Sequence, residues 1–392
     1  MPASHPQPGS TAALRDANVR RILDTLRGAQ RRGSDLTQAQ LARRTELSPA
    51  TISGIVRNMA AAGIVEVGPS SGRRGGRVRI VRGAGLVAGI SFGHSHLGVA
   101  VGDLAGQILA QRRIQLAADH RADDGLTLAS DLLDQTLTEA GEPRTQVRHV
   151  GIGLPAPLAR GVVQSPGILP GWIGLDATAI AADKLGLPVV VDNDANLGAL
   201  AELRRGGPDR GKSLIFLKVS SGVGAGIILD GRLQRGATGM AGELGHATVD
   251  ETGPYCRCGN RGCLEAYVSV PHVLAALSTT LPGDSFAEVV AEARGGHPAA
   301  IRALEDVGTH LGRTIAVVVN LLEPGTIVVG GELAIAGDLV LAPLRATLKR
   351  HCLDAVATQT LIVSTSLGED ATLIGAVEVA LDHADIVDDL DR

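Results

Sequence analysis

Hydrophobic and polar residues follow a helical period at the start of the chain. Val19, Ile22, Leu23 and Leu26 are spaced one, three or four positions apart, which places them on one face of a helix. Glycine often follows the last turn of a helix, so this helix is expected to run for about three turns and to end near Gly28. The pattern predicts a short amphipathic helix that packs against further elements of the same segment.

Residues that favour helix starts predict two more helices. Thr37 and Gln40 have the spacing of a capping box, in which each side chain bonds the backbone of the other residue. Ser48 followed by Pro49 is an N-cap with proline at the first helical position, and the helix that it opens is expected to stop at Gly63. Two short helices separated by a tight turn form a helix-turn-helix.

The third predicted helix has two faces of different chemistry. Its apolar residues are Ile52, Ile55, Val56 and Met59. If these residues face inward, the exposed side carries Ala50, Thr51, Ser53, Gly54 and Arg57. Small polar side chains with one arginine suit close approach to base edges and phosphates in the major groove of DNA.

Two short strands, at 64–67 and 78–81, are expected to form a hairpin around the loop GPSSGRRGGR. The arginines of this loop are Arg73, Arg74 and Arg77. Among glycines they resemble a wing that lays guanidinium groups along phosphates or into a narrow minor groove. Residues 15–82 are therefore predicted to form a winged helix-turn-helix domain that binds double-stranded operator DNA. A different small helical bundle with a flexible Arg/Gly linker stays open as the alternative.

Charge is distributed unevenly between the two parts of the chain. Residues 1–82 carry 14 arginines, no lysine and five acidic residues, which gives +9, whereas the remainder carries −13 and the whole chain −4. A basic segment ahead of an acidic one points to a polyanionic partner for the first part alone. A solvated arginine-rich surface would show the same charge, so the charge supports DNA binding without establishing it.

The rest of the chain, 83–392, alternates between strand and helix patterns. Strands are expected at 86–92, 97–101, 108–114, 187–191, 213–219, 224–229, 326–329 and 361–365, and helices at 126–140, 194–205, 298–322, 338–350 and 370–383. This alternation predicts α/β architecture. Two glycine-rich turns, ISFGHS and SSGVGAG, stand at equivalent places in two strand-turn-strand units, which suggests two related lobes with a cleft between them.

A cluster of thiols and one imidazole stands in the middle of this region. Cys256, Cys258 and Cys263 lie in the run CRCGNRGCLE, and His246 precedes the first of them by ten residues at the end of GMAGELGH. Three thiols and an imidazole are the ligand set of a closed tetrahedral zinc site, and the short loops between them favour a structural ion. The neighbouring carboxylates Glu243 and Glu265 need another explanation.

Composition and the N-terminal residues predict the cellular compartment in which the protein is found. No long apolar run is present, the first residues have neither a basic start nor an apolar segment typical of a secretion signal, and three of the four cysteines are clustered. These features favour the cytoplasm over an oxidising compartment with a disulfide framework.

The motifs VDNDAN, GMAGELGH, CRCGNRGCLE and GILPGW, placed behind a winged helix, resemble the ROK family of sugar kinases and sugar-responsive repressors across almost the whole chain. The resemblance implies an actin-like, two-lobed sugar-kinase (ATPase) fold with a hexose in the cleft, and zinc held by the His/Cys cluster. The sugar contacts that it implies are Asn193, Asp194, Glu243, His246 and Glu265. An imidazole that binds a metal still has a second nitrogen for a sugar hydroxyl. The alternative is that Glu243 and Glu265 only cap helices.

The first glycine turn departs from the family's kinases, whose turn resembles DxGGT. Here Ser91 replaces the acid that helps to organise the metal nucleotide, and His94 replaces a glycine. ATP and magnesium are therefore not expected as cofactors, and no catalytic residue is expected unless Asp194 serves as the base of a kinase. Ile168 stands where many of the kinases have asparagine, and Trp172 is expected to pack rather than to stack on a sugar.

These observations predict a cytoplasmic transcription regulator, a repressor whose kinase-like body binds a sugar effector without phosphorylating it. A homodimer or higher homo-oligomer is expected, because two recognition helices must match the half-sites of a palindrome. The main alternative is an active ATP-dependent hexose kinase with a DNA-binding head. A further alternative is a constitutive DNA-binding protein whose body has lost affinity for sugar.

Overall fold

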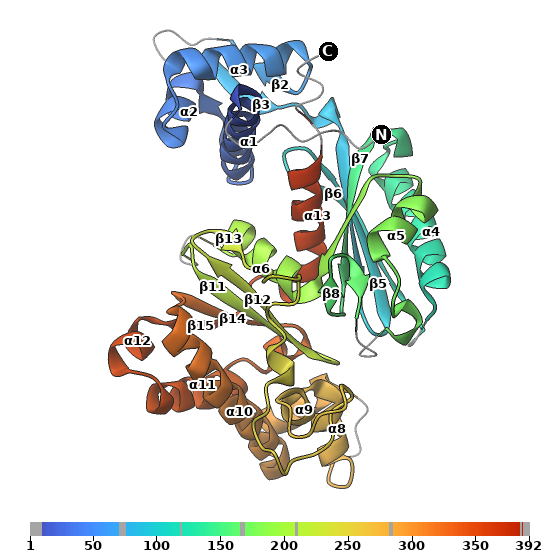
Figure 1. The fold of residues 1–392 in the computed structure, drawn as a ribbon, viewed down its shortest axis with the longest axis vertical. Helices are drawn as coiled ribbons and strands as arrows, with labels where there is room; N and C mark the ends of the chain where they lie inside the picture. The colour runs from blue at the N-terminus through green and yellow to red at the C-terminus, as the bar shows by residue number, and fades with distance from the viewer. Residues whose placement is uncertain are drawn as a thin grey trace.

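Three bodies make up the protein, a small head and two larger α/β lobes (Figure 1). The structure is a computed structural model, and it describes residues 10–69, 76–117, 120–164, 169–207, 211–281, 285–384 and 386. Within these ranges no helix is both long enough and apolar enough to pass through a membrane.

The head consists of three helices and a three-stranded antiparallel sheet. The helices are α1 (Thr11–Gln30), α2 (Gln38–Thr45) and α3 (Pro49–Ala61), and the strands, in the order β1-β3-β2, are β1 (Leu36–Thr37), β2 (Val65–Val67) and β3 (Arg77–Ile80). Thr37 and Gln40 form the predicted capping box, and the side chain of Ser48 accepts a hydrogen bond from the backbone of Thr51. The predicted winged helix-turn-helix is confirmed.

The prediction for the first helix was wrong in its length. Helix α1 covers 20 residues because it begins already at Thr11, where the side chain of Ser10 accepts a hydrogen bond from the backbone of Ala13, and it ends at Gln30, two residues past Gly28. The last turn is stabilised from outside the head, because Arg27 is buried and donates hydrogen bonds to the backbone carbonyls of Leu104 (3.0 Å) and Leu381 (3.4 Å) in the body. A tertiary contact of this kind overrides the local preference of glycine for a helix end.

The first lobe is built on a five-stranded sheet with the order β10-β7-β4-β5-β6. Its strands are β4 (Leu86–Phe92), β5 (His96–Asp103), β6 (Ile108–Gln115), β7 (Val147–Leu154) and β10 (Val189–Asn193). Helices α4 (Ala122–Ala140) and α5 (Ala177–Leu185) cover one face, and α13 (Ala371–His383) covers the other (Figure 1). A short hairpin, β8 (Leu158–Ala159) and β9 (Val162–Val163), follows β7.

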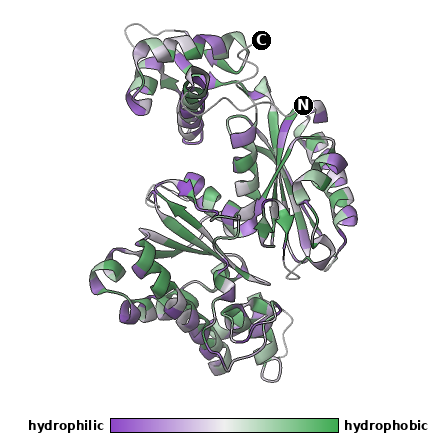
Figure 2. Ribbon diagram, viewed as in Figure 1, coloured by the Kyte–Doolittle hydropathy of each residue, from purple (hydrophilic) through white to green (hydrophobic). Residues whose placement is uncertain are grey.

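The second lobe repeats this sheet with the order β13-β12-β11-β14-β15. Its strands are β11 (Leu214–Val219), β12 (Val223–Leu229), β13 (Arg232–Leu233), β14 (Thr326–Gly330) and β15 (Leu361–Ser364). Its helices are α6 (Asp194–Arg205), α7 (Glu265–Val268), α8 (Val270–Leu277), α9 (Phe286–Arg294), α10 (Pro298–Leu322), α11 (Asp338–His351) and α12 (Asp354–Gln359). Figure 2 shows hydrophobic strands in both lobes, covered by helices whose outer faces are hydrophilic.

Both sheets combine the same pairings in the same positions. Three successive strands pair antiparallel, and two later strands extend the sheet in parallel from the first of them. The turns β4–β5 and β11–β12 therefore occupy equivalent places, as the two glycine-rich motifs predicted. The predicted two-lobed α/β arrangement is confirmed.

Helices α6 and α13 pack against each other between the two sheets (Figure 1). The backbones approach so closely at Gly375 that an added Cβ would lie 1.9 Å from the carbonyl oxygen of Leu197. At the α6 N-terminus the hydroxyl of Thr372 donates a hydrogen bond to the carbonyl of Asp194 (3.1 Å). The two helices thus form one packed unit that links the lobes.

We predict that Gly375→Ala destabilises the protein by about 1–3 kcal/mol, because a buried methyl group would force α6 and α13 apart. Alanine otherwise favours a helix over glycine, so a loss of stability would report the clash itself. Urea unfolding measures the effect. The matched control is Gly54→Ala in α3, where an added Cβ meets no atom within 4 Å. Equal stability of the two variants would contradict the close packing.

Candidate functional site

A cleft of about 550 Å³ lies between the two lobes. It is lined by both glycine turns, the start of α6 and the segments that follow β7 and β13. The five residues predicted to contact a sugar all line it, namely Asn193, Asp194, Glu243, His246 and Glu265. The volume is that of an ordinary small-molecule site. Residues more than 70 positions apart in the sequence therefore meet in one place.

Helix α6 begins at the wall of the cleft. The side-chain oxygen of Asn193 accepts hydrogen bonds from the backbone of Ala195 (2.9 Å) and Asn196 (3.4 Å), and its amide donates to the carbonyl of Ala156 (3.2 Å). Asn193 is therefore the N-cap of α6, and its role toward a sugar stays a prediction. Asp194, the first residue of the helix, is buried and faces the cleft.

Lys218 is a cleft residue that the sequence analysis missed. Its ammonium group forms an ion pair with the carboxylate of Asp194, and both side chains are largely buried. The sequence did hold a signal for Lys218 as a site residue. It is the single charged residue in the otherwise apolar strand β11, immediately ahead of the second glycine turn. Only the fold shows that its partner is Asp194.

Two further carboxylates converge on the cleft from the segment after β13, Glu243 from a loop and Glu265 from the start of α7. Burial, together with the charges of Asp194 and Glu265, raises the pKa of Glu243 to about 7. Glu265 accepts a hydrogen bond from the backbone of Val223 (3.0 Å) and pairs with Arg257 (3.1 Å). Neither carboxylate makes a helix-capping bond among the described contacts, so the capping alternative has no support there.

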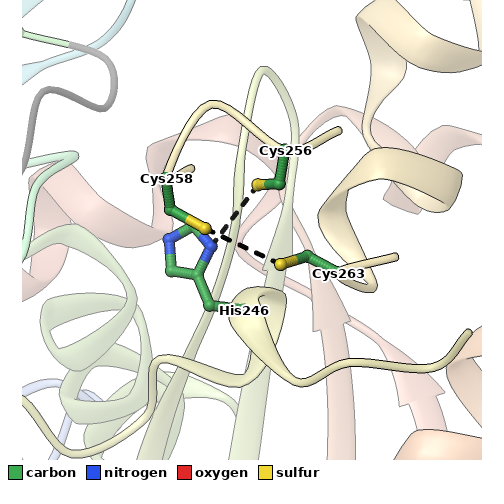
Figure 3. Close-up of side chains that lie close together, drawn as sticks. All are labelled: His246, Cys256, Cys258 and Cys263. Atoms are coloured by element: carbon green, nitrogen blue, oxygen red, sulfur yellow. Dashed lines mark hydrogen bonds between the residues drawn. The ribbon is translucent and has the colours of Figure 1, made fainter. Parts of the chain in front are cut away.

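The four predicted metal ligands lie together at the edge of the cleft (Figure 3). Their ligand atoms all lie within 4.8 Å of one another, and the group could hold a metal ion. Nδ1 of His246 lies 3.7 Å from Sγ of Cys256, and Sγ of Cys258 lies 3.7 Å from Sγ of Cys263. Nε2 of His246 faces away from the thiols and lies 3.9 Å from the carboxylate of Glu243. One imidazole thus faces the thiols with one nitrogen and a cleft carboxylate with the other.

Histidines fill the first glycine turn. His94 and His96 both line the cleft beside Ser91, and an added Cβ on Gly93 would lie 2.3 Å from the ring of His96. Burial, together with the charges of Arg113 and Lys218, lowers the pKa of His96 to about 4. The turn therefore presents the neutral imidazole of His96, the side chain of His94 and a serine hydroxyl where a carboxylate would be needed to organise a metal nucleotide.

The recognition face of α3 has the predicted orientation. Ile52, Ile55, Val56 and Met59 are buried in the head. On the opposite side Ala50 and Arg57 are exposed and Thr51, Ser53 and Gly54 are half-buried, and Arg77 at the start of β3 is exposed as well. Arg73, Arg74 and Ile168 lie outside the described residues. Trp172 is fully buried against Phe92 and does not line the cleft, as its expected packing role requires.

Comparison with known proteins places this architecture in a family. A model of the ROK family matches residues 87–383. The chain belongs to the ROK family. A model of the MarR family matches residues 18–74, which cover most of the winged helix of this ROK protein.

Relatives of this ROK protein include regulators and kinases. The xylose repressor of Bacillus subtilis is 27% identical over 358 residues, which cover 90% of this chain and 92% of the repressor. The crystal structure of a ROK family transcriptional regulator, a homologue of the E. coli MLC protein, superposes with a TM-score of 0.80 at 25% identity and covers 96% of this chain and 99% of its own. A ROK family glucokinase from Streptomyces griseus, solved with glucose and AMPPNP, has a TM-score of 0.66 at 27% identity and covers 76% of this chain and 100% of its own.

Proposed function

We propose that this protein is a sugar-responsive repressor, whose cleft binds a sugar and whose head binds operator DNA. The observation that carries the proposal is the joint presence of both parts in one chain, a winged helix with an exposed polar face on α3 and a cleft lined by carboxylates, an amide and an imidazole. Similarity over almost the full length to a protein named xylose repressor supports it.

The chemistry of the cleft fits a polyhydroxyl ligand. Asp194, Glu243 and Glu265 offer carboxylate oxygens, and each can accept hydrogen bonds from neighbouring hydroxyls of a sugar ring. With a pKa of about 7, Glu243 can also serve as a donor when protonated. The proposed sugar contacts are these three carboxylates together with Asn193 and the free nitrogen of His246.

We assign zinc to the His/Cys cluster. In a tetrahedron with Zn–S bonds of about 2.3 Å, two sulfur atoms are about 3.8 Å apart, close to the 3.7 Å between Cys258 and Cys263. Burial raises the pKa of Cys263 to about 12, so a bound cation is needed to hold this thiol as thiolate. When bound, zinc would fix the loop that carries His246 and thereby orient the imidazole at the edge of the cleft.

The head is proposed to bind DNA through the exposed side of α3 and the hairpin that follows it. Ala50, Thr51, Ser53 and Arg57 would face the major groove, and Arg73, Arg74 and Arg77 would contact the backbone or the minor groove. We propose a homodimer, because a pair of recognition helices matches a palindromic operator.

A sensor rather than a kinase is proposed for the cleft because of the ion pair between Lys218 and Asp194. A general base at Asp194 would have to take a proton from a sugar hydroxyl, which would remove the negative charge that the buried ammonium group of Lys218 pairs with. The histidines and the serine of the first glycine turn supply no carboxylate for magnesium. Binding of a sugar requires neither proton transfer to Asp194 nor a carboxylate that holds magnesium.

The DNA and sugar functions are tested together with duplex fragments that the protein selects from random-sequence DNA. A saturating effector sugar is expected to weaken binding about tenfold, a typical coupling between two sites. Arg57→Ala is expected to weaken DNA binding about tenfold and to leave sugar affinity unchanged. Fluorescence anisotropy gives the DNA affinity and calorimetry gives the sugar affinity, with Arg350→Ala, an exposed position outside the head, as the control. Absence of selected DNA, or of any sugar response, would refute the proposal.

A coupled assay of ADP release tests for phosphorylation. With ATP, magnesium and common hexoses and pentoses we expect no sugar-dependent ADP, and Asp194→Asn is expected to weaken sugar binding without changing this background. Sugar-dependent turnover that Asp194→Asn abolishes would instead favour a hexose kinase with a DNA-binding head.

Metal analysis tests the zinc assignment. Freshly purified protein is expected to hold one zinc per chain, and Cys258→Ser is expected to lose the metal and lower the melting temperature, because binding of the ion contributes to folding. Cys352→Ser, outside the cluster, should keep full zinc content. Wild-type protein with substoichiometric zinc, or a Cys258→Ser variant that keeps it, would argue against a structural ion.

A further inference from the structure

A buried carboxylate joins the head to α6 and α13, the pair of helices between the lobes, which is called the hinge from here on. Glu378 lies in α13 with a side chain that is 1% exposed. Arg31, the residue that caps the C-terminus of α1 in the head, contacts it at 2.7 Å. Arg204 (3.3 Å) and Arg205 (2.6 Å), the last two residues of α6, contact it from the body. One carboxylate is therefore shared between the DNA-binding head and the helix that begins in the cleft.

Helix α6 connects this carboxylate with the cleft directly. Its first residue is Asp194 and its last is Arg205, so its 12 residues span about 18 Å at 1.5 Å per residue. Nine consecutive residues of α6, Asp194 to Glu202, are buried, so the helix has little freedom to bend independently of its neighbours. A displacement of its first turn would therefore carry through to Arg204 and Arg205.

The second helix of the hinge is tied to α6 at both ends. Near the cleft Thr372 bonds the carbonyl of Asp194, and at the far end Glu378 meets Arg204 and Arg205. Between these points lies the backbone contact at Gly375. Thr372 also lines the cleft, so both helices begin where a ligand would bind.

Among the three ion pairs of Glu378, the pair with Arg31 of the head is the one that can break, because of the charges around Glu378. Burial alone would raise the pKa of Glu378, but Arg31, Arg205 and Arg204 outweigh it and lower the pKa to about 2, so the group stays an anion. If Arg31 left, Glu378 would still have two guanidinium partners and would not become an unpaired buried charge. The three guanidinium groups also repel one another. Asp382 offsets part of this repulsion, because it pairs with Arg204 at 2.8 Å. Breaking the pair between Arg31 and Glu378 therefore costs less free energy than one would expect from the loss of Arg204 or Arg205.

We propose that Glu378 relays sugar binding from the cleft to the head. A sugar bound at the start of α6 shifts this helix, Arg204 and Arg205 take a larger share of the carboxylate, and the pair between Arg31 and Glu378 breaks. The head then leaves its docked position and its affinity for the operator falls. This inference rests on the proposed function and adds the positioning residues, Arg31 and Glu378, that neither the sugar nor the DNA touches.

The chain offers a matched control for this relay. Arg27 is, like Arg31, a buried arginine near the end of α1 that holds the head on the body, but it bonds the carbonyls of Leu104 and Leu381 and not Glu378. A variant at Arg27 loosens the head without touching the link to α6. The comparison of Arg31→Gln with Arg27→Gln therefore separates loss of the relay from simple loss of docking.

The experiment uses the full chain with D-xylose, D-glucose and N-acetyl-D-glucosamine as probes. Calorimetry first identifies which probe binds, and anisotropy with a selected DNA duplex then gives the ratio of DNA affinities without and with that sugar. We expect a ratio of about ten in the wild type and in Arg27→Gln, and a ratio near one in Arg31→Gln. Hydrogen exchange of the last turn of α1 should rise on sugar binding in the wild type and be unresponsive in Arg31→Gln, with sugar affinity unchanged.

The outcomes distinguish the relay from the function on which it rests. If Arg31→Gln keeps the wild-type ratio and the wild-type exchange response, or if both arginine variants lose the ratio equally, the relay through Glu378 is wrong while sugar-responsive repression stands. If no probe binds the wild type, the proposed function fails and the relay with it. Glu378→Gln serves as a second variant, since it keeps the shape of the side chain and should also give a ratio near one.

Discussion

The contact between α6 and α13 is the constraint on which the rest of the architecture depends. The two helices meet at backbone distance because Gly375 has no side chain, and each of them also covers one of the two sheets. Both lobes are therefore held by the same pair of helices. The cleft opens at one end of this pair, and the head docks at the other. Movement of the lobes relative to each other would therefore change how the two helices pack, together with side contacts between the lobes such as the pair of Arg235 and Asp192 (2.7 Å).

Charge compensation runs along this axis from the cleft to the head. At the cleft Asp194 is paired with Lys218, and Glu265 with Arg257. At the far end Glu378 is paired with arginines from α6 and from the head. Buried charges are tolerated only when they are paired, so each pair restricts which neighbours can move apart. The pair of Asp194 with Lys218 lies in the cleft, and the cluster at Glu378 joins the far end of α6 to the head.

The His/Cys cluster, which could hold a metal ion, lies beside the cleft in a segment made mainly of loops. The segment from Glu243 to Cys263 contains no long helix or strand, and His246 and the three cysteines bring its ends together. One nitrogen of His246 faces the thiols and the other faces Glu243, so the same imidazole adjoins both the cluster and the cleft. The same residue thus serves the fold and the cleft.

Local sequence determined the parts of this protein that depend on nearby residues. The capping box at Thr37, the N-cap at Ser48 and the apolar stripe of α3 fixed the winged helix, because each involves residues within a few positions. The close spacing of the cysteines indicated a candidate metal cluster for the same reason, and the two glycine-rich turns indicated two lobes, whereas the residues that line the cleft were expected from the resemblance to the ROK family.

Only the tertiary structure decided the contacts between distant segments. The extension of α1 past Gly28 depends on Arg27 bonding carbonyls of the body, and the partners of Lys218 and Glu378 come from other elements of the chain. No periodicity or spacing encodes such pairs, because the energy of a buried charge depends on which side chains the fold brings within a few ångströms of it. The sequence thus specified the elements and the candidate ligands, whereas packing decided which charges meet and how the head is joined to the cleft.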